Sequence, residues 1–316
     1  MNSFKNKWYN WLVIDSRSLR LFRVAFGLIL LVDLLIKFND IPAFYSDVGI
    51  VSNTFLSSAL PSWFFGIFQF CGDPDVVRLL FGFQAVLLIG FILGWGLPIV
   101  TVFLYVFNFS LVNRMPYAMN GANFLITNLL FIFSFLPLSE RLSISKENRS
   151  WPGPCFSWWN VALFIQIVII YLFPIVTRTD ASWWQNFTAV SLIAQNEIYT
   201  TKLLGLLVSL PLGAQALTLL SLLCELSIVL LLFFGFMLPE QERTKLILAC
   251  LIFVLHFSIL VLMDIGLFPY LGLAISLIFI PSCIWGGIDK AHAGNLFGPV
   301  NLIKEKLGLV CAVLLS

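Results

Sequence analysis

Apolar runs of about 20 residues alternate with short polar gaps along most of the chain, and most charged residues fall in the gaps. A helix needs about 20 apolar residues to cross the hydrocarbon core of a bilayer. Inside lipid the backbone polar groups must be satisfied within the protein, and a helix satisfies them within one segment. The pattern therefore predicts an all-α fold, a polytopic transmembrane helical bundle of about eight spans. The expected spans are residues 18–37, 76–95, 97–112, 122–138, 159–176, 214–236, 246–263 and 266–285.

Three regions follow from this pattern. Residues 1–17 are basic and aromatic, which predicts an amphipathic segment on the cytoplasmic membrane surface. Residues 18–285 form the transmembrane domain, and residues 286–316 form a short cytoplasmic tail. The apolar stretch 203–212, which Pro211 and Gly213 interrupt, is either interfacial or a ninth crossing that would invert everything after it.

The distribution of basic residues supports an even number of spans. With Met1 on the cytoplasmic side, thirteen of the 18 Lys and Arg residues lie on that side. The five on the other side are Lys37, Arg78, Arg114, Arg178 and Lys202. Short cytoplasmic loops carry an excess of Lys and Arg in membrane proteins. We therefore expect both termini in the cytoplasm, and a multi-pass protein of the inner (cytoplasmic) cell membrane.

Composition limits the kinds of ligand. The net charge is only +2 over 316 residues, which argues against nucleic acid as a partner. The six cysteines are scattered and form no C-x-x-C pair, so we expect neither a disulfide framework nor a metal site.

Three ionisable residues lie at membrane depth. Such groups are costly to bury in lipid and usually face a partner or a water-filled cavity. Glu225 and His256 lie near the middle of consecutive antiparallel spans, so they can pair as an acid–base element. A structural hydrogen bond between helices explains them equally well. Asp33 lies in the outer part of the first span and can simply pair with Lys37 one turn further on.

Milder polar residues recur at helical spacing. Asn120, Asn123 and Thr127 share one face of the fourth span, and Tyr171 and Arg178 share one face at the outer end of the fifth. Hydrogen bonding between helices is the commoner reason for such stripes. The other reason is a polar interior that holds a ligand.

Several segments resemble the HTTM domain, the membrane domain that vitamin K-dependent γ-carboxylases share. The opening DSRSLRLFRVAFGLILLVDLL from Asp15 and the segment FYSDVGI from Phe44 carry the resemblance, together with QIVIIYLFPIVTRTDASWW from Gln166. It extends to about Trp285. It implies a helical membrane domain with an interior site for a hydrophobic cofactor, a quinone or another lipid.

The chain departs from the carboxylases at their catalytic base. The resemblance places the family's catalytic lysine in the segment VTRTDASW, where this chain has Thr177 and Arg178. An arginine stays protonated, with a pKa above about 12, and cannot take the proton that such a lysine takes. The β-rich domain of the carboxylases is also not found after the helices. We therefore do not expect γ-carboxylase activity, and whether any reaction is catalysed stays open.

Two functions remain. In the first, a cavity binds a quinone-like cofactor or lipid, and activity on a membrane or secreted substrate accompanies it. Its cofactor-binding residues would be Arg178, Tyr171, Asp180, Trp183, Asn120, Asn123, Thr127 and Asp33, with His256 and Glu225 as catalytic candidates. In the second, the protein is a non-enzymatic membrane factor for maturation or export of a small secreted peptide, which the loop 38–75 would contact. A transporter for a small acid or lipid is a weaker third reading.

Overall fold

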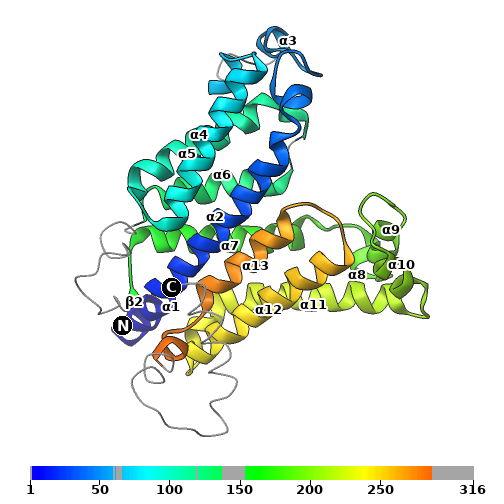
Figure 1. Ribbon diagram of the computed structural model, residues 1–316. Coiled ribbons are helices and arrows are strands. Elements are labelled where there is room, and N and C mark those ends of the chain that lie inside the picture. Colours follow the sequence, from blue (N-terminus) through cyan, green and yellow to red (C-terminus); the bar gives the residue numbers. More distant parts are fainter. Residues whose placement is uncertain (1, 60, 62–65, 119, 137–153, 287–316) are drawn as a thin grey trace, which may run out of the picture. The chain divides into compact units, whose positions relative to one another are not determined.

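Helices dominate the computed structural model, which describes residues 2–59, 61, 66–118, 120–136 and 154–286 (Figure 1). The chain divides into two compact units, one of residues 1–22 and 151–316 and one of residues 23–150. Of the tail expected at 286–316, everything after Gly286 lies outside the described residues.

The unit of residues 23–150 is built on three long helices and a folded loop. The long helices are α2 (Ser16–Phe38), which begins in the other unit, α4 (Pro74–Leu93) and α5 (Leu97–Arg114). The shorter elements are the π-helix η1 (Ile41–Tyr45), α3 (Asn53–Ala59), the 3-10 helices η2 (Ile67–Gln69) and η3 (Pro116–Ala118), and α6 (Gly121–Phe133).

Local sequence explains how α4 begins and ends. The side chain of Asp73 accepts hydrogen bonds from the backbone N–H groups of Asp75 and Val76, and Pro74 occupies the first turn, where no donor is needed. The helix ends at Gly94, whose φ of 85° suits glycine. A Cβ there would lie 2.7 Å from Nη1 of Arg23, so a side chain would collide with that guanidinium. Arg23 in turn donates to the carbonyl of Ile92 at 3.3 Å.

Aromatic side chains fill the core of this unit. Phe26 of α2 stacks on Phe133 of α6 with ring centroids 5.7 Å apart, and Phe91 of α4 meets Phe133 edge-on at 5.5 Å. All three rings are buried. Three helices therefore meet at one aromatic cluster.

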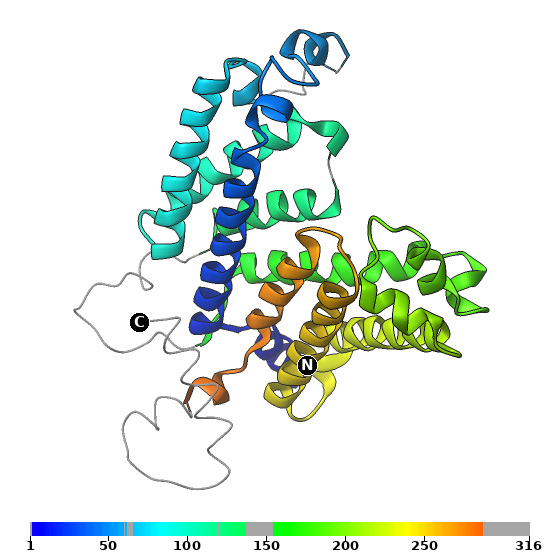
Figure 2. The ribbon, with the colours of Figure 1, turned by 45° about the vertical axis from the view of Figure 1, so that its right-hand side comes forward.

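The unit of residues 1–22 and 151–316 contains the remaining elements. They are α1 (Asn2–Leu12), the two-residue strands β1 (Ile14–Asp15) and β2 (Pro154–Cys155), α7 (Trp158–Thr177), α8 (Ala181–Trp184), α9 (Ala189–Ala194), α10 (Lys202–Ser209), α11 (Gly213–Phe234), η4 (Gly235–Met237), α12 (Gln241–Leu262), α13 (Phe268–Ser276) and η5 (Leu277–Phe279). β1 pairs with β2 antiparallel. α11, α12 and α13 follow one another as neighbours, while α8, α9 and α10 gather beside one end of α11 (Figure 2).

The N-terminal segment predicted at 1–17 contains α1, which packs against the turn between α11 and α12. Trp11 donates to the carbonyl of Leu232 at 3.4 Å, and the ring of Trp8 lies 4.7 Å from that of Phe236. Lys245 of α12 donates to the carbonyls of Asn10 and Val13, at 2.9 Å each. These contacts tie α1 to its own unit.

A helix lies in each of the eight segments expected to span the membrane, but not every one of these helices is long and apolar enough to cross it. Five helices are long and apolar enough to cross, namely α4, α5, α7, the segment Gly213–Met237, and α12. α2 has 23 residues but carries five charged ones, Arg17, Arg20, Arg23, Asp33 and Lys37. α6 has 13 residues and Phe268–Phe279 is also a shorter apolar helix, so each falls short of a 30 Å hydrocarbon core.

The stretch 203–212, left open between interfacial and spanning, forms the eight-residue helix α10 and a turn. A helix of that length extends only about 12 Å, too short for a crossing. The turn passes through Leu212, whose φ is 60°. This region is therefore not a ninth span.

Candidate functional site

Arg178 and Glu225 form a two-pronged ion pair between α7 and α11. Arg178 follows the last residue of α7, and its guanidinium reaches Glu225 in the middle of α11. Nη2 donates to Oε1 at 3.0 Å, and Nη1 donates to Oε2. The two side chains are 19% and 11% exposed, so the pair is largely removed from solvent. A fork of this kind is among the stronger polar contacts in proteins.

Two tryptophans complete the surroundings of Arg178. The guanidinium carbon lies 4.0 Å from the centre of the Trp183 ring, within the range of a cation–π contact. Trp184 donates its indole N–H to the carbonyl of Arg178 at 2.6 Å. α8 therefore holds the end of α7 in place through both residues.

Tyr171 and His256 form a second polar pair, deeper along α7. The Tyr171 hydroxyl lies 3.0 Å from Nε2 of His256 on α12, and both side chains are buried. The imidazole also packs against α13, where Phe268 lies 5.3 Å away between ring centroids. A Cβ on Gly272 would lie 2.1 Å from Nδ1, so the glycine makes room for the ring. Nδ1 has no hydrogen-bond partner among the described residues.

These partners replace the predicted pairing of Glu225 with His256. Position along two helices fixes depth but not the direction in which a side chain points. Tyr171 and Arg178 are seven residues apart and share one face of α7. That face supplies a partner to each of the two residues, so Glu225 binds Arg178 and His256 binds Tyr171.

Asp180 is a helix cap. Its carboxylate accepts from the backbone N–H of Ser182 at 2.8 Å and begins α8. The hydrogen bonds from the Ser182 side chain and backbone lower the pKa of Asp180. Asp180 therefore positions α8, which carries Trp183.

The remaining candidates belong to the unit of residues 23–150. Asp33 pairs with Lys37 at 2.6 Å, as the spacing predicts. Asn120 caps α6 through its contacts with Ala122 and Asn123, and Asn123 bonds back to the backbone of Asn120. Thr127 accepts from Asn108 of α5 at 2.7 Å. Helix capping and a bond between helices therefore explain this stripe.

The sequence reasoning missed Gln84. It lies in the middle of α4, only 6% exposed, and its Oε1 has no partner among the residues that the structure describes. Gln84, Asp33 and Asn108 line a small cavity of about 10 Å³. That volume is about the minimum that holds one water molecule. The sequence feature that could have revealed Gln84 is that it is a lone amide within the apolar run 76–95.

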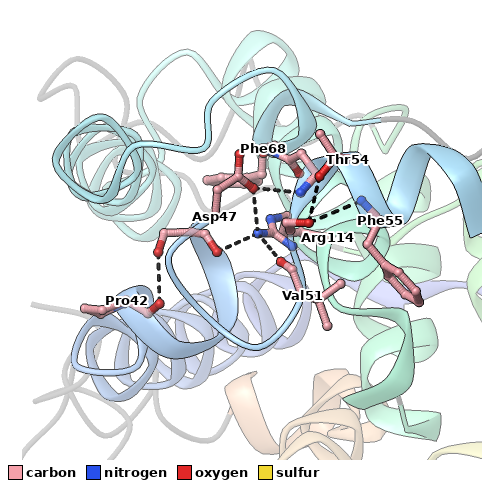
Figure 3. Close-up of polar contacts among 10 residues, drawn as sticks. Pro42, Asp47, Val51, Thr54, Phe55, Phe68 and Arg114 are labelled. Atoms are coloured by element: carbon pink, nitrogen blue, oxygen red, sulfur yellow. Dashed lines mark hydrogen bonds and ion pairs between the residues drawn. The ribbon is translucent and has the colours of Figure 1, made fainter.

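Arg114 was expected only as an outer-side charge, but its side chain is fully buried at the end of α5 (Figure 3). Nη2 donates to the carbonyls of Ser46 and Val51, at 2.8 Å each, and lies 3.4 Å from a carboxylate oxygen of Asp47. Within the described part of the chain, Nε and Nη1 have no hydrogen-bond partner. Arg114 thus organises the loop between α2 and α3.

A cleft of about 780 Å³ opens at the other end of α12 from His256. α1, the start of α12 and the residues after η5 line it, including Lys7, Asp15, Glu242 and Lys245. Its charges are mixed in sign. Over the described ranges, no group of three His, Cys, Asp or Glu side chains is placed to hold a metal ion.

Five helices long and apolar enough to cross a membrane, with an ion pair and a Tyr–His pair between helices, are the features of a helical membrane protein. The HTTM domain model matches residues 11–284, and the chain therefore belongs to the HTTM domain family. No curated protein and no solved structure matches it.

Proposed function

We propose that the protein binds a hydrophobic molecule with a polar head, such as a quinone or another lipid, beside Arg178 and Tyr171. The observation that carries this proposal is the polar cluster on one face of α7, which supplies a partner to an acid on α11 and to a histidine on α12. Ionisable groups within spans are costly and usually mark a functional site.

Each residue of the cluster has a role in the proposed site. Glu225 neutralises Arg178 and fixes its guanidinium over Trp183, so a planar head group has a flat cationic and aromatic surface to bind. The Tyr171–His256 pair offers both a donor and an acceptor, and it can bind a carbonyl or hydroxyl oxygen or move a proton. Arg178 is not a base, so a carboxylase mechanism is not part of the proposal.

The proposed topology has eight spans and both termini in the cytoplasm: the five longer helices, α2, and the predicted segments 122–138 and 266–285, in which residues beyond α6 and α13 must complete the crossing because these two helices alone are too short. The excess of Lys and Arg on the predicted cytoplasmic side supports it. The proposed location is the inner cell membrane. Reporter fusions after Phe38, Leu93, Arg114 and Thr177 test the topology, because they must report outside, inside, outside and outside. An inside signal after Thr177 would overturn it.

The binding proposal is tested by mass spectrometry of organic extracts from protein purified in mild detergent. We expect one quinone or lipid at near-stoichiometric amount in wild type and its loss in Arg178→Ala and Tyr171→Phe. Arg78→Ala is the matched control, because Arg78 also pairs with a carboxylate, Asp75, but lies exposed in the other unit. Arg78→Ala must keep the ligand.

Equal bulk phospholipid in all four samples would overturn the binding proposal. The buried pairs would then be structural, and the non-enzymatic role in maturation or export of a small secreted peptide would be the reading to pursue. Size-exclusion profiles of each variant separate loss of ligand from loss of fold.

A further inference from the structure

Among the described residues of the loop between α2 and α4, four large apolar side chains are exposed. Val48 is 73% exposed, Ile50 70%, Phe55 51% and Phe70 83%. We call these four residues the loop apolar face. The surface of a soluble protein rarely exposes a group of such side chains unless a partner or a membrane covers them.

The backbone beneath this face is held by specific contacts. The N–H of Asp47 donates to the carbonyl of Gly72 at 2.8 Å, and Asn53 donates to the carbonyl of Phe68 at 3.3 Å. A Cβ on Gly72 would lie 1.9 Å from the Asp47 carboxylate, so the chain segments around these two residues are in direct contact. These contacts hold the segment of Val48 and Ile50 against the segment of Phe70.

Arg114 fixes the inner side of the same loop. Its Nη2 bonds the carbonyls of Ser46 and Val51, one on each side of Val48 and Ile50 (Figure 3). Asp47, which lies between them, also accepts from the N–H of Asn53 at 2.7 Å. A buried cation therefore shapes the turn from which Val48 and Ile50 project.

The loop apolar face continues into the exposed stripe of α4. Five apolar residues of α4 recur at helical spacing and are well exposed, namely Val76, Leu79, Phe83, Val86 and Ile89. α4 is one of the helices long and apolar enough to cross a membrane, and in a crossing helix lipid would cover such an exposed apolar stripe. Phe70 precedes α4 by only a few residues, which brings the loop apolar face to the end of this stripe.

We propose that the loop apolar face inserts into the phospholipid surface on the side of the membrane where α4 begins. Three acidic side chains close to it have partners within the protein, which lowers the cost of bringing them to the membrane surface. Asp47 is held by Arg114 and Asn53, Asp73 caps α4, and Asp75 pairs with Arg78. The partner is thus the bilayer interface, which anchors the loop and the outer end of α4.

Spin labels test this proposal in proteoliposomes of neutral phosphatidylcholine. Labels are attached to Val48→Cys, Ile50→Cys and Phe70→Cys in full-length protein whose six native cysteines are replaced. The control is Ser57→Cys, an exposed polar position on α3 of the same loop. We expect labels at 48, 50 and 70 to meet oxygen, which concentrates in lipid, several-fold more often than a water-soluble nickel chelate. The label at 57 should show the reverse preference.

Labels at 48, 50 and 70 that meet the nickel chelate as often as the label at 57 would overturn the proposal, and a protein or peptide partner would then have to cover the face. The role of the loop contacts is tested with Gly72→Ala, which displaces Asp47 without removing a charge. We expect the label at Ile50→Cys to lose its lipid preference in that background. An unchanged label there would show that these contacts do not set the insertion.

Discussion

Arg178 and Arg114, one in each unit, are held in different ways. Arg178 binds a carboxylate through both prongs of its fork and is still 19% exposed. Arg114 is fully buried, and its two shortest contacts are with backbone carbonyls, while the carboxylate of Asp47 lies 3.4 Å away. The comparison separates two uses of the same side chain. Arg178 joins two helices through charge, whereas Arg114 fixes the shape of a loop through the backbone.

Removing Arg114 should have the largest effect. Arg114→Met leaves the carbonyls of Ser46 and Val51 and the carboxylate of Asp47 without their donor. Breaking a buried charged contact from one side costs about 3–5 kcal/mol. Thermal unfolding of the purified protein in detergent measures the loss. Arg78→Met, which breaks an exposed pair, is the control and should cost less than about 1 kcal/mol. Equal losses of stability in Arg114→Met and Arg78→Met would show that the buried contacts of Arg114 stabilise the protein no more than the exposed pair of Arg78.

Breaking the contact of Arg178 should cost less stability than removing Arg114, and a second substitution should restore part of the loss. Glu225→Leu leaves Arg178 charged and without its partner, which we expect to cost about 1–3 kcal/mol because the pair is partly exposed. Adding Arg178→Met should recover part of that loss. A double-mutant cycle in the same unfolding assay measures the coupling. Additive losses would mean that the fork contributes nothing to stability.

The contrast also shows what the sequence could reveal. Apolar runs located a helix in each of the eight expected segments, because hydrophobic length is a local property. The helices α6 and α13 end at Phe133 and Ser276, earlier than predicted, since an apolar run does not show where a helix gives way to a turn. The number of membrane crossings consequently stays a prediction.

The partners of buried polar groups were harder to predict. Asp33 with Lys37 is one turn of a single helix, and local spacing predicted it correctly. The partner of Glu225 depends on which face α7 turns toward α11. The spacing of residues within one helix does not predict that orientation. Arg114 resembled an ordinary interfacial charge, because the loop that encloses it lies about 60 residues away in the sequence.

A smaller effect tests the close contact beside the Tyr171–His256 pair. Gly272→Ala forces the His256 ring to move, and overpacking of this kind costs about 1–3 kcal/mol. Alanine recovers about 1 kcal/mol through its better helix propensity, so we expect a net loss of about 1 kcal/mol. In a His256→Ala background the same change should be neutral or stabilising. A loss of the same size in both backgrounds would show that His256 is not what Gly272 accommodates.

The smallest effect concerns Asp180, which begins the helix that holds Trp183 under Arg178. The hydrogen bonds from Ser182 lower the pKa of Asp180 below its ordinary value of 3.8. The cap is therefore fully present above pH 3.8 and is lost as the pH falls through the lowered pKa. Asp180→Asn keeps a good cap but has no proton to gain. With 5-fluorotryptophan in the protein, the fluorine signal of Trp183, assigned through Trp183→Phe, should shift below pH 3.8 in wild type and stay constant in Asp180→Asn. A shift in both proteins would assign the acid response to another group and leave the Arg178 site independent of its helix cap.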